Sequence, residues 1–148
     1  MIHPEGIGHV VLKVRNLERS ERFYTETLGL KVVDRYKGKM IFFSWADNHH
    51  DLAILTVGDN AEGAKAEQVG LAHVALRLKS FEDLRAAHAF LKEQGIPISG
   101  TSDHGVSRSV YFADPDGNQI EVFCDTLPHE WEAGVRPRVA QNKPLQLE

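Results

Sequence analysis

Two histidines stand at equivalent points of an internal repeat, and together they could begin a metal site. Residues 6–14 read GIGHVVLKV and residues 70–78 read GLAHVALRL, so His9 and His73 occupy the same place in the two copies. An internal repeat indicates two structural units of the same shape. Two imidazoles that face the space shared by such units are suited to bind a transition metal, which indicates chemistry rather than a passive scaffold.

A glutamate and a tyrosine are candidates to complete this site. The turn signal DPDGN at 114–118 predicts a hairpin in which Tyr111 lies opposite Glu121 on one sheet face, with Cβ atoms about 5 Å apart. A carboxylate in an apolar strand is costly to bury unless it is paired or bound to a metal. Two histidines and one glutamate leave coordination positions open, as in non-haem Fe(II) oxygenases and some Mn(II) or Zn(II) enzymes. The alternative is an exposed glutamate or one that pairs with Lys13 or Arg77.

Two further histidines stand where a loop enters a predicted strand. His50 lies in the run His49-His50-Asp51, and His104 precedes Gly105. Functional side chains are often found at such positions. Taken alone, each is more simply explained as a solvated loop histidine.

The elements that must position these residues follow one order in both copies. Alternating apolar residues predict a strand at each repeat histidine, with an apolar face that packs on a helix. Asn16 and Ser80 suit the N-caps of the two helices, and Gly29 and Gly95 suit their ends. Three short strands follow each helix, roughly at 30–36, 40–45 and 52–57 in the first copy and at 98–100, 109–113 and 119–123 in the second.

The overall composition limits which partners and which cell compartment we expect. The chain has 148 residues, and its net charge of -4 gives no reason to expect nucleic acid or an anionic membrane as a partner. It contains no apolar run of membrane-spanning length and no features of a signal peptide, and Cys124 is its only cysteine. We therefore expect a cytoplasmic protein, in which residues 127–148 form an irregular C-terminal tail.

These residues resemble the vicinal oxygen chelate superfamily, which includes glyoxalases, bleomycin-resistance proteins, fosfomycin-resistance transferases and extradiol dioxygenases. The resemblance covers about residues 5–125 and rests on the two histidine-bearing strands, on Phe23-Tyr24 with Leu28-Gly29-Leu30, and on DPDGNQIE at 114–121. It implies an α+β fold in which two paired βαβββ modules, about 5–60 and 68–126, form a cupped mixed sheet around a metal within a single domain of residues 1–126. It also implies that His9, His73 and Glu121 are the metal ligands.

Within the superfamily, the chain looks most like a small single-domain extradiol catechol dioxygenase. HDLA at 50–53 is similar to the family's His-Asp-x-Ala segment, and HGVS at 104–107 is similar to its His-Gly-Val-Ser segment. The resemblance implies that His50 is the acid/base, that Tyr111 is the active-site tyrosine and that His104 borders the substrate. It also implies Fe(II), or else Mn(II) or another divalent metal, with a small catechol-type aromatic and O₂ as substrates. A homodimer is the default expectation for a soluble oligomer.

Other functions stay open. Aligning the last strands of the two copies places Glu121 against Ala53. The resemblance to glyoxalase-like lyases and isomerases implies a metal site with four ligands, one of them a carboxylate or amide in the first copy, so such a site would lack one ligand here. Fosfomycin-type thiol transferases carry a threonine where this chain has Val11. A non-catalytic binding protein of the bleomycin-resistance kind would need a wide apolar groove, which Tyr36, Phe43 and Trp45 could line.

Overall fold

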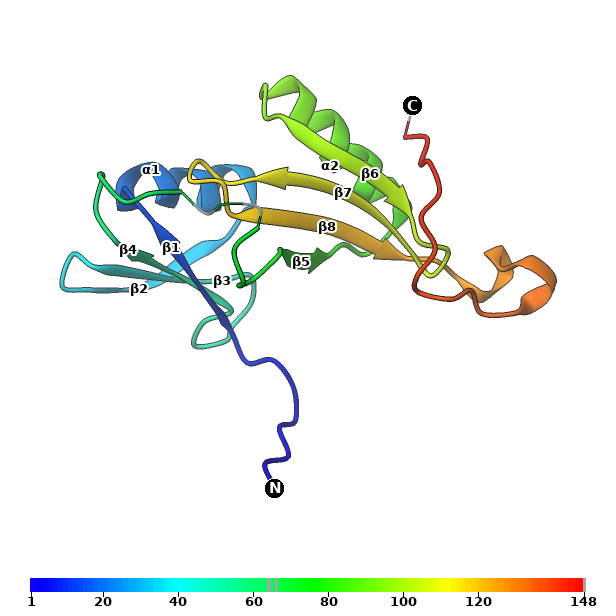
Figure 1. Cartoon of the computed structure of the whole chain (residues 1–148), viewed down its shortest axis with the longest axis horizontal. Coiled ribbons are helices and arrows are strands. Elements are labelled where there is room, and N and C mark those ends of the chain that lie inside the picture. Colours follow the sequence, from blue (N-terminus) through cyan, green and yellow to red (C-terminus); the bar gives the residue numbers. More distant parts are fainter. Residues whose placement is uncertain (64, 66, 148) are drawn as a thin grey trace. The chain divides into compact units, whose positions relative to one another are not determined.

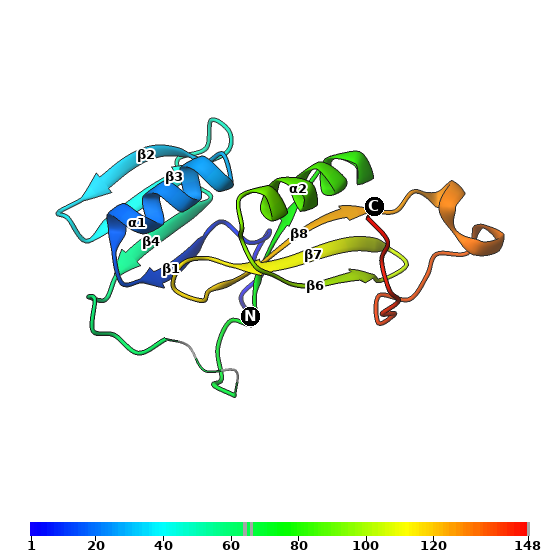
Figure 2. The same cartoon turned by 90° about the horizontal axis from the view of Figure 1, so that it is seen from above.

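The chain divides into two compact units, each built from a four-stranded sheet and a helix (Figures 1 and 2). A computed structural model describes residues 1–63, 65 and 67–147. The first unit comprises Met1–Gln68 with Asp114–Asn118, and the second comprises Val69–Ala113 with Gln119–Glu148. Each unit follows the order strand, helix and three strands, which confirms the predicted α+β class and the βαβββ plan of each copy.

The sheet of the first unit has the strand order β1-β4-β3-β2. Strands β1 and β4 pair in parallel, whereas β3 pairs antiparallel with both β4 and β2. The alternating pattern predicted for the first strand is present, because Leu12 and Val14 are buried while Val11 and Lys13 are exposed. The strands are β1 (Val10–Val14), β2 (Lys31–Tyr36), β3 (Met40–Ser44) and β4 (Leu52–Thr56).

The helix of the first unit, α1 (Leu17–Arg22), packs against β3 and β4. As predicted, Asn16 caps its start, since the side-chain Oδ1 accepts a hydrogen bond from the Arg19 backbone N–H at 2.9 Å. The helix was predicted to run to residue 28 in one form, but Phe23–Thr27 form a wider π-helical segment. Gly29, with φ of +69°, then reverses the chain, as its lack of a Cβ allows.

The core of the first unit lies between this helical segment and the sheet. Tyr24 and Phe43 are fully buried, and their ring centroids lie 5.7 Å apart. The suggestion that Phe43 lines an open groove is therefore wrong. Its side chain points to the helix-covered face of β3, where it excludes water from the core.

The turn Asp114–Asn118 belongs to the first unit, and a buried carboxylate organises it. Asp114 accepts hydrogen bonds from the backbone N–H groups of Asp116 and Asn118, from the Asn118 side-chain amide and from the Tyr24 hydroxyl. Asp116 in turn pairs with Arg15 and Arg19, at 3.1 and 2.6 Å. The DPDGN string therefore acts as a structural clamp on the first helix as well as a turn between two strands.

The sheet of the second unit has the equivalent order β5-β8-β7-β6, and its helix α2 (Phe81–Glu93) packs against β7 and β8. The predicted hairpin register is confirmed, because Tyr111 pairs with Glu121 and Ala113 pairs with Gln119. The predicted N-cap is also present, since Ser80 accepts a hydrogen bond from the Asp83 backbone N–H. The strands are β5 (Val74–Arg77), β6 (Ile98–Asp103), β7 (Ser107–Ala113) and β8 (Gln119–Asp125).

Strands β6, β7 and β8 run further than the sequence predicted. Pairing continues through Asp103 opposite Arg108, so the connection between β6 and β7 is the short loop that carries His104 and Gly105. Asp103 also forms an isolated bridge with Lys143 of the C-terminal tail, which extends the pairing at that end of β6. Apart from that bridge, the described tail holds two short 3₁₀ turns, Pro128–Glu130 and Glu132–Gly134. In the described part of the chain, no helix is both long and apolar enough to span a lipid bilayer.

Candidate functional site

Glu121 is the centre of a polar cluster in the second unit. Its side chain is 10% exposed, although it stands between Ile120 and Val122 in a strand whose neighbours form the core. One carboxylate oxygen, Oε2, lies 2.9 Å from His73 Nε2, and the other, Oε1, accepts a hydrogen bond from the Tyr111 hydroxyl at 3.0 Å. The carboxylate is therefore buried and paired, which is the condition under which such a group is tolerated in an apolar strand.

Strand pairing explains why these three side chains meet. Strand β8 is flanked by β7 on one side and by β5 on the other. Tyr111 is the direct cross-strand partner of Glu121, and Ala75 is its partner on β5. His73 is two residues before Ala75 and therefore projects from the same face. It lies just before β5 rather than inside it, and His9 lies just before β1 in the same way.

His104 extends the cluster by one further side chain. Its Nε2 lies 2.9 Å from the Tyr111 hydroxyl, and its Nδ1 lies 2.6 Å from the backbone carbonyl of Gln141. A continuous row of hydrogen-bonding groups therefore runs from Gln141 through His104 and Tyr111 to Glu121 and His73. The resemblance implied that His104 borders the substrate, but no sequence signal indicated its contact with Gln141.

The charge on Glu121 affects the tyrosine beside it. Burial raises the pKa of the Tyr111 hydroxyl, and the carboxylate of Glu121 raises it further. Tyr111 is therefore a protonated hydrogen-bond donor at neutral pH. Such a group can hold an oxygen atom of a ligand by donating to it.

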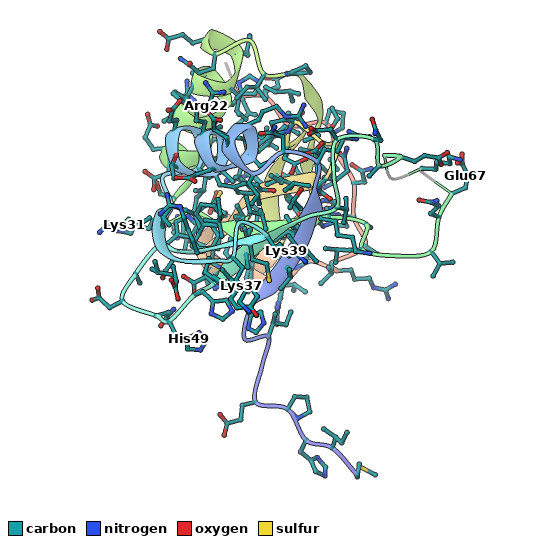
Figure 3. The ribbon with its side chains drawn as sticks, turned by 90° about the vertical axis from the view of Figure 1, so that its left-hand side faces the viewer. Arg22, Lys31, Lys37, Lys39, His49 and Glu67 are labelled. Carbon is teal, nitrogen blue, oxygen red and sulfur yellow. The ribbon has the colours of Figure 1, made fainter. Side chains whose placement is uncertain are left out.

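A second cluster, of three imidazoles, lies in the first unit. The rings of His9 and His50 lie 4.2 Å apart between centroids, and His49 Nδ1 lies 2.6 Å from His50 Nδ1. The parallel pairing of β1 with β4 produces the first contact, since the backbone N–H of Val10 donates to the carbonyl of Asp51. Figure 3 shows that His49 projects outward from the loop between β3 and β4. The sequence prediction included His9 and His50 but assigned no role to His49.

Asp51 shapes the loop that carries His50. Its carboxylate accepts hydrogen bonds from the Ser44 hydroxyl at 2.7 Å, from the Trp45 backbone N–H at 3.1 Å and from the Asn48 amide at 2.7 Å. The Ser44 bond is the main cause that lowers the pKa of Asp51, and the other two bonds add to it. Partial desolvation, together with the neighbouring imidazoles, lowers the pKa of His50, so its ring is neutral at pH 7 and can accept a proton.

The two units also confirm one expectation about the repeat. Ala53 pairs with Val11, just as Glu121 pairs with Ala75, so Ala53 is the structural equivalent of Glu121 in the first unit. Its side chain is fully buried and offers no ligand atom. At these repeat-equivalent positions the first unit therefore has His9 and Ala53, whereas the second has His73 and Glu121.

The predicted site residues thus fall into two groups. His73, Glu121, Tyr111 and His104 are brought together in the second unit, and His9 and His50 are brought together in the first. Among the described residues, no three His, Cys, Asp or Glu side chains lie close enough to hold a metal ion. The complete ligand set of His9, His73 and Glu121 therefore stays a prediction.

Comparison with known proteins identifies relatives over most of the chain. The family model described as "Glyoxalase/Bleomycin resistance protein/Dioxygenase superfamily" matches residues 6–122. A catechol-2,3-dioxygenase of Bacillus subtilis (strain 168) is 37% identical over 85% of this chain and 44% of its own length. A biphenyl-2,3-diol 1,2-dioxygenase 2 of Rhodococcus globerulus is 32% identical over 85% of this chain and 66% of its own length. The chain thus spans less than two thirds of either relative.

More distant relatives carry other names. They include a manganese-dependent 2,3-dihydroxybiphenyl 1,2-dioxygenase of Geobacillus genomosp. 3 at 28% identity and an iron-dependent extradiol dioxygenase of Rhodococcus jostii (strain RHA1) at 26%. A probable lactoylglutathione lyase of Vibrio parahaemolyticus is 26% identical over 79% of this chain and 88% of its own length. Among solved structures, a glyoxylase/bleomycin resistance protein/dioxygenase domain from Frankia sp. EAN1pec has a TM-score of 0.71, with 24% identity over 84% of this chain and 100% of its own. That structure supports the fold alone.

Proposed function

We propose that this chain, which belongs to the glyoxalase/bleomycin resistance protein/dioxygenase superfamily, is a metal-dependent extradiol dioxygenase that opens the ring of a catechol-type aromatic with O₂. The observation that carries the proposal is the buried Glu121, which has His73 on one oxygen and Tyr111 on the other. The names of the dioxygenase relatives at 32% and 37% identity support the same activity.

The chemistry of the candidate side chains supports a divalent metal as the cofactor. We propose that His9, His73 and Glu121 hold it, because imidazole nitrogen and carboxylate oxygen suit both Fe(II) and Mn(II). The paired state of Glu121 supports this assignment, since a buried carboxylate next to an imidazole is already arranged as a pair of donor atoms. Fe(II) is the proposed resident metal and Mn(II) the alternative, in keeping with the iron- and manganese-dependent relatives. When bound, the metal would act as a Lewis acid that favours the deprotonated catechol, and it would supply the redox chemistry for O₂.

The chain's own side chains would orient the substrate and move its protons. Tyr111, which stays protonated, would form a hydrogen bond with a substrate oxygen. His50, with a neutral ring, would accept the second phenolic proton and return it to the product. His104 would border the substrate and fix the Tyr111 hydroxyl through the contact at 2.9 Å. Both atoms of O₂ enter the ring-opened product, so the reaction consumes no external reductant.

A metal-dependent lyase acting on an α-hydroxycarbonyl compound is the second candidate. The relatives named as probable lactoylglutathione lyases favour it, because this chain spans 88% of the length of one of them. Ala53 argues against it, since the first unit has no carboxylate or amide at the place equivalent to Glu121. The burial of Phe43 likewise weakens the alternative of a sequestering protein with an aromatic groove. The homodimer stays a prediction, to be checked by sedimentation equilibrium.

The test is a ring-cleavage assay on the reconstituted protein. Fe(II) is titrated anaerobically into the metal-free chain with catechol or 2,3-dihydroxybiphenyl present, O₂ is admitted, and the yellow ring-fission product is followed by absorbance. We expect product with the wild type, none with Glu121→Ala, and an unchanged rate with the control Glu18→Ala, whose carboxylate is exposed on α1. Tight Fe(II) binding without O₂ uptake would instead favour the lyase, and absence of metal binding would favour the sequestering protein.

A further inference from the structure

The C-terminal tail folds back onto the edge of the second sheet rather than fraying. Residues 137–147, which we call the strap, approach the end of β6 and the loop that follows it. Lys143 and Asp103 exchange two backbone hydrogen bonds, each of 2.9 Å. Asn142 Oδ1 accepts a hydrogen bond from the Ser102 hydroxyl at 2.7 Å, and Leu147 near the chain end is buried. The strap therefore has both directional and apolar contacts with its own unit.

The loop that carries His104 is shaped to receive the strap. Gly105 has a φ of +79°, and a Cβ added there would lie 2.7 Å from Pro137 Cβ, which is closer than side chains approach. The carbonyl of Gly105 accepts a hydrogen bond from the Thr126 hydroxyl at 2.6 Å. The oxygen of that hydroxyl accepts a hydrogen bond from Trp131 Nε1. Only glycine combines this backbone conformation with so close a neighbour.

The contact between the strap and His104 determines which ring nitrogen carries the proton. A backbone carbonyl can only accept a hydrogen bond, so the distance of 2.6 Å to Gln141 O requires a proton on His104 Nδ1. The opposite tautomer of the neutral ring would place two lone pairs at that distance. With the proton on Nδ1, the neutral ring presents a lone pair at Nε2, which faces the Tyr111 hydroxyl at 2.9 Å.

We propose that the strap is a positioning element, in which the main-chain carbonyl of Gln141 selects the Nδ1–H tautomer of His104 and makes Nε2 a proton acceptor for Tyr111. Tyr111 has one hydroxyl proton and two acceptors, Nε2 of His104 and Oε1 of Glu121. When the strap is docked, the Tyr111 hydroxyl can donate its proton to His104 Nε2 instead of Glu121. When the strap is undocked, Glu121 is the only one of these two groups that still accepts it. The tautomer is a property of the protein alone, and only its effect on turnover rests on the proposed function.

The test measures the His104 tautomer in the metal-free protein. Long-range ¹H–¹⁵N correlation spectra of ¹⁵N-histidine-labelled protein distinguish a protonated from an unprotonated ring nitrogen, and His104→Gln identifies the signals by their loss. Lys143→Pro removes the backbone N–H that donates to Asp103 and so undocks the strap, whereas Lys143→Ala keeps that N–H and is the matched control. A chain ending at residue 139, which lacks the Gln141 carbonyl altogether, is the second variant.

We expect the Nδ1–H tautomer in the wild type and in Lys143→Ala, and a shift towards the Nε2–H form in Lys143→Pro and in the shortened chain. An Nε2–H ring in the wild type would overturn the proposal, as would an unchanged tautomer in the shortened chain with its remaining spectrum intact. In the Fe(II)-loaded protein, the same two variants should lower kcat more than they change KM. If the wild type opens no catechol ring but the tautomer shifts as stated, the proposed function fails and the role of the strap stands.

Discussion

The hydrogen bond between Tyr24 and Asp114 gives the sharpest prediction about stability. Tyr24 is fully buried, and its hydroxyl donates to Asp114 Oδ2 at 2.9 Å. Burial and the charge of Asp114 both raise the pKa of this hydroxyl, so it is a protonated donor at neutral pH. The substitution Tyr24→Phe removes one oxygen atom and leaves the aromatic packing against Phe43 in place.

The size of the effect follows from what Asp114 retains. Its Oδ2 still accepts from the Asn118 side-chain amide at 2.8 Å, and its Oδ1 still accepts two backbone N–H groups, so the carboxylate keeps partners. The loss is then that of one hydrogen bond to a charged group, about 1.5–3 kcal/mol. For a chain of this length, that free energy corresponds to a fall in Tm of roughly 3–12 °C.

The assay is urea unfolding followed by circular dichroism, with the free energy of unfolding extrapolated to water. Tyr36→Phe is the matched control, because Tyr36 is 51% exposed and its substitution should change stability by less than about 0.5 kcal/mol. A double-mutant cycle with Asp114→Asn should give a coupling energy of about 0.5–3 kcal/mol. A cost for Tyr24→Phe no larger than that of the control would refute the view that the DPDGN turn clamps the first helix.

Three further predictions concern the site, the core and the tail. His50→Ala should retain the metal, measured by elemental analysis, but lose ring cleavage, and a full rate in that variant would contradict the proton-transfer role. Phe43→Ala should cost about 3–5 kcal/mol in urea unfolding because it opens a cavity in the core, whereas a groove-lining residue would cost far less. The pKa of Glu130 is lowered by the hydrogen bond from the Leu127 backbone N–H and, to a smaller extent, by Arg108. The ionised form of Glu130 therefore stabilises the tail at pH values above the unfolded glutamate pKa of about 4.3. This contribution disappears as the pH falls through the pKa of Glu130 in the folded protein. In a Trp45→Phe background, Trp131 fluorescence should report this acid transition, and Glu130→Gln should abolish it.

The sequence predicted the hairpin register because two local signals agree. Apolar alternation gives the two faces of β7 and β8, and the DPDGN turn sets which residues pair, so Tyr111 is correctly placed opposite Glu121. The same logic placed His9 and His73 only approximately, since both lie one residue before their strands. The expected contacts form all the same, since His73 meets Glu121 and His9 meets His50.

Features that depend on distant contacts were not predictable. Phe43 and Trp45 stand two residues apart in an aromatic-rich run, and only the packing of Tyr24 shows that Phe43 belongs to the core. The strap was predicted only as an irregular tail, because its backbone bonds to Asp103 and His104 involve main-chain atoms that carry no residue signature. The equivalence of Ala53 and Glu121 could be predicted from the repeat, since it follows from matching the last strands of the two copies.

The central claim is that Glu121 belongs to a metal site that uses O₂ to open an aromatic ring. The most direct measurement is the stoichiometry of the reaction of the Fe(II)-loaded chain with 2,3-dihydroxybiphenyl, with O₂ consumption followed by an oxygen electrode and the product identified by mass spectrometry. We predict that one O₂ is consumed per substrate, that the product has gained two oxygen atoms, and that both signals vanish in Glu121→Ala. A loaded wild-type protein that binds the substrate but consumes no O₂ would contradict the claim.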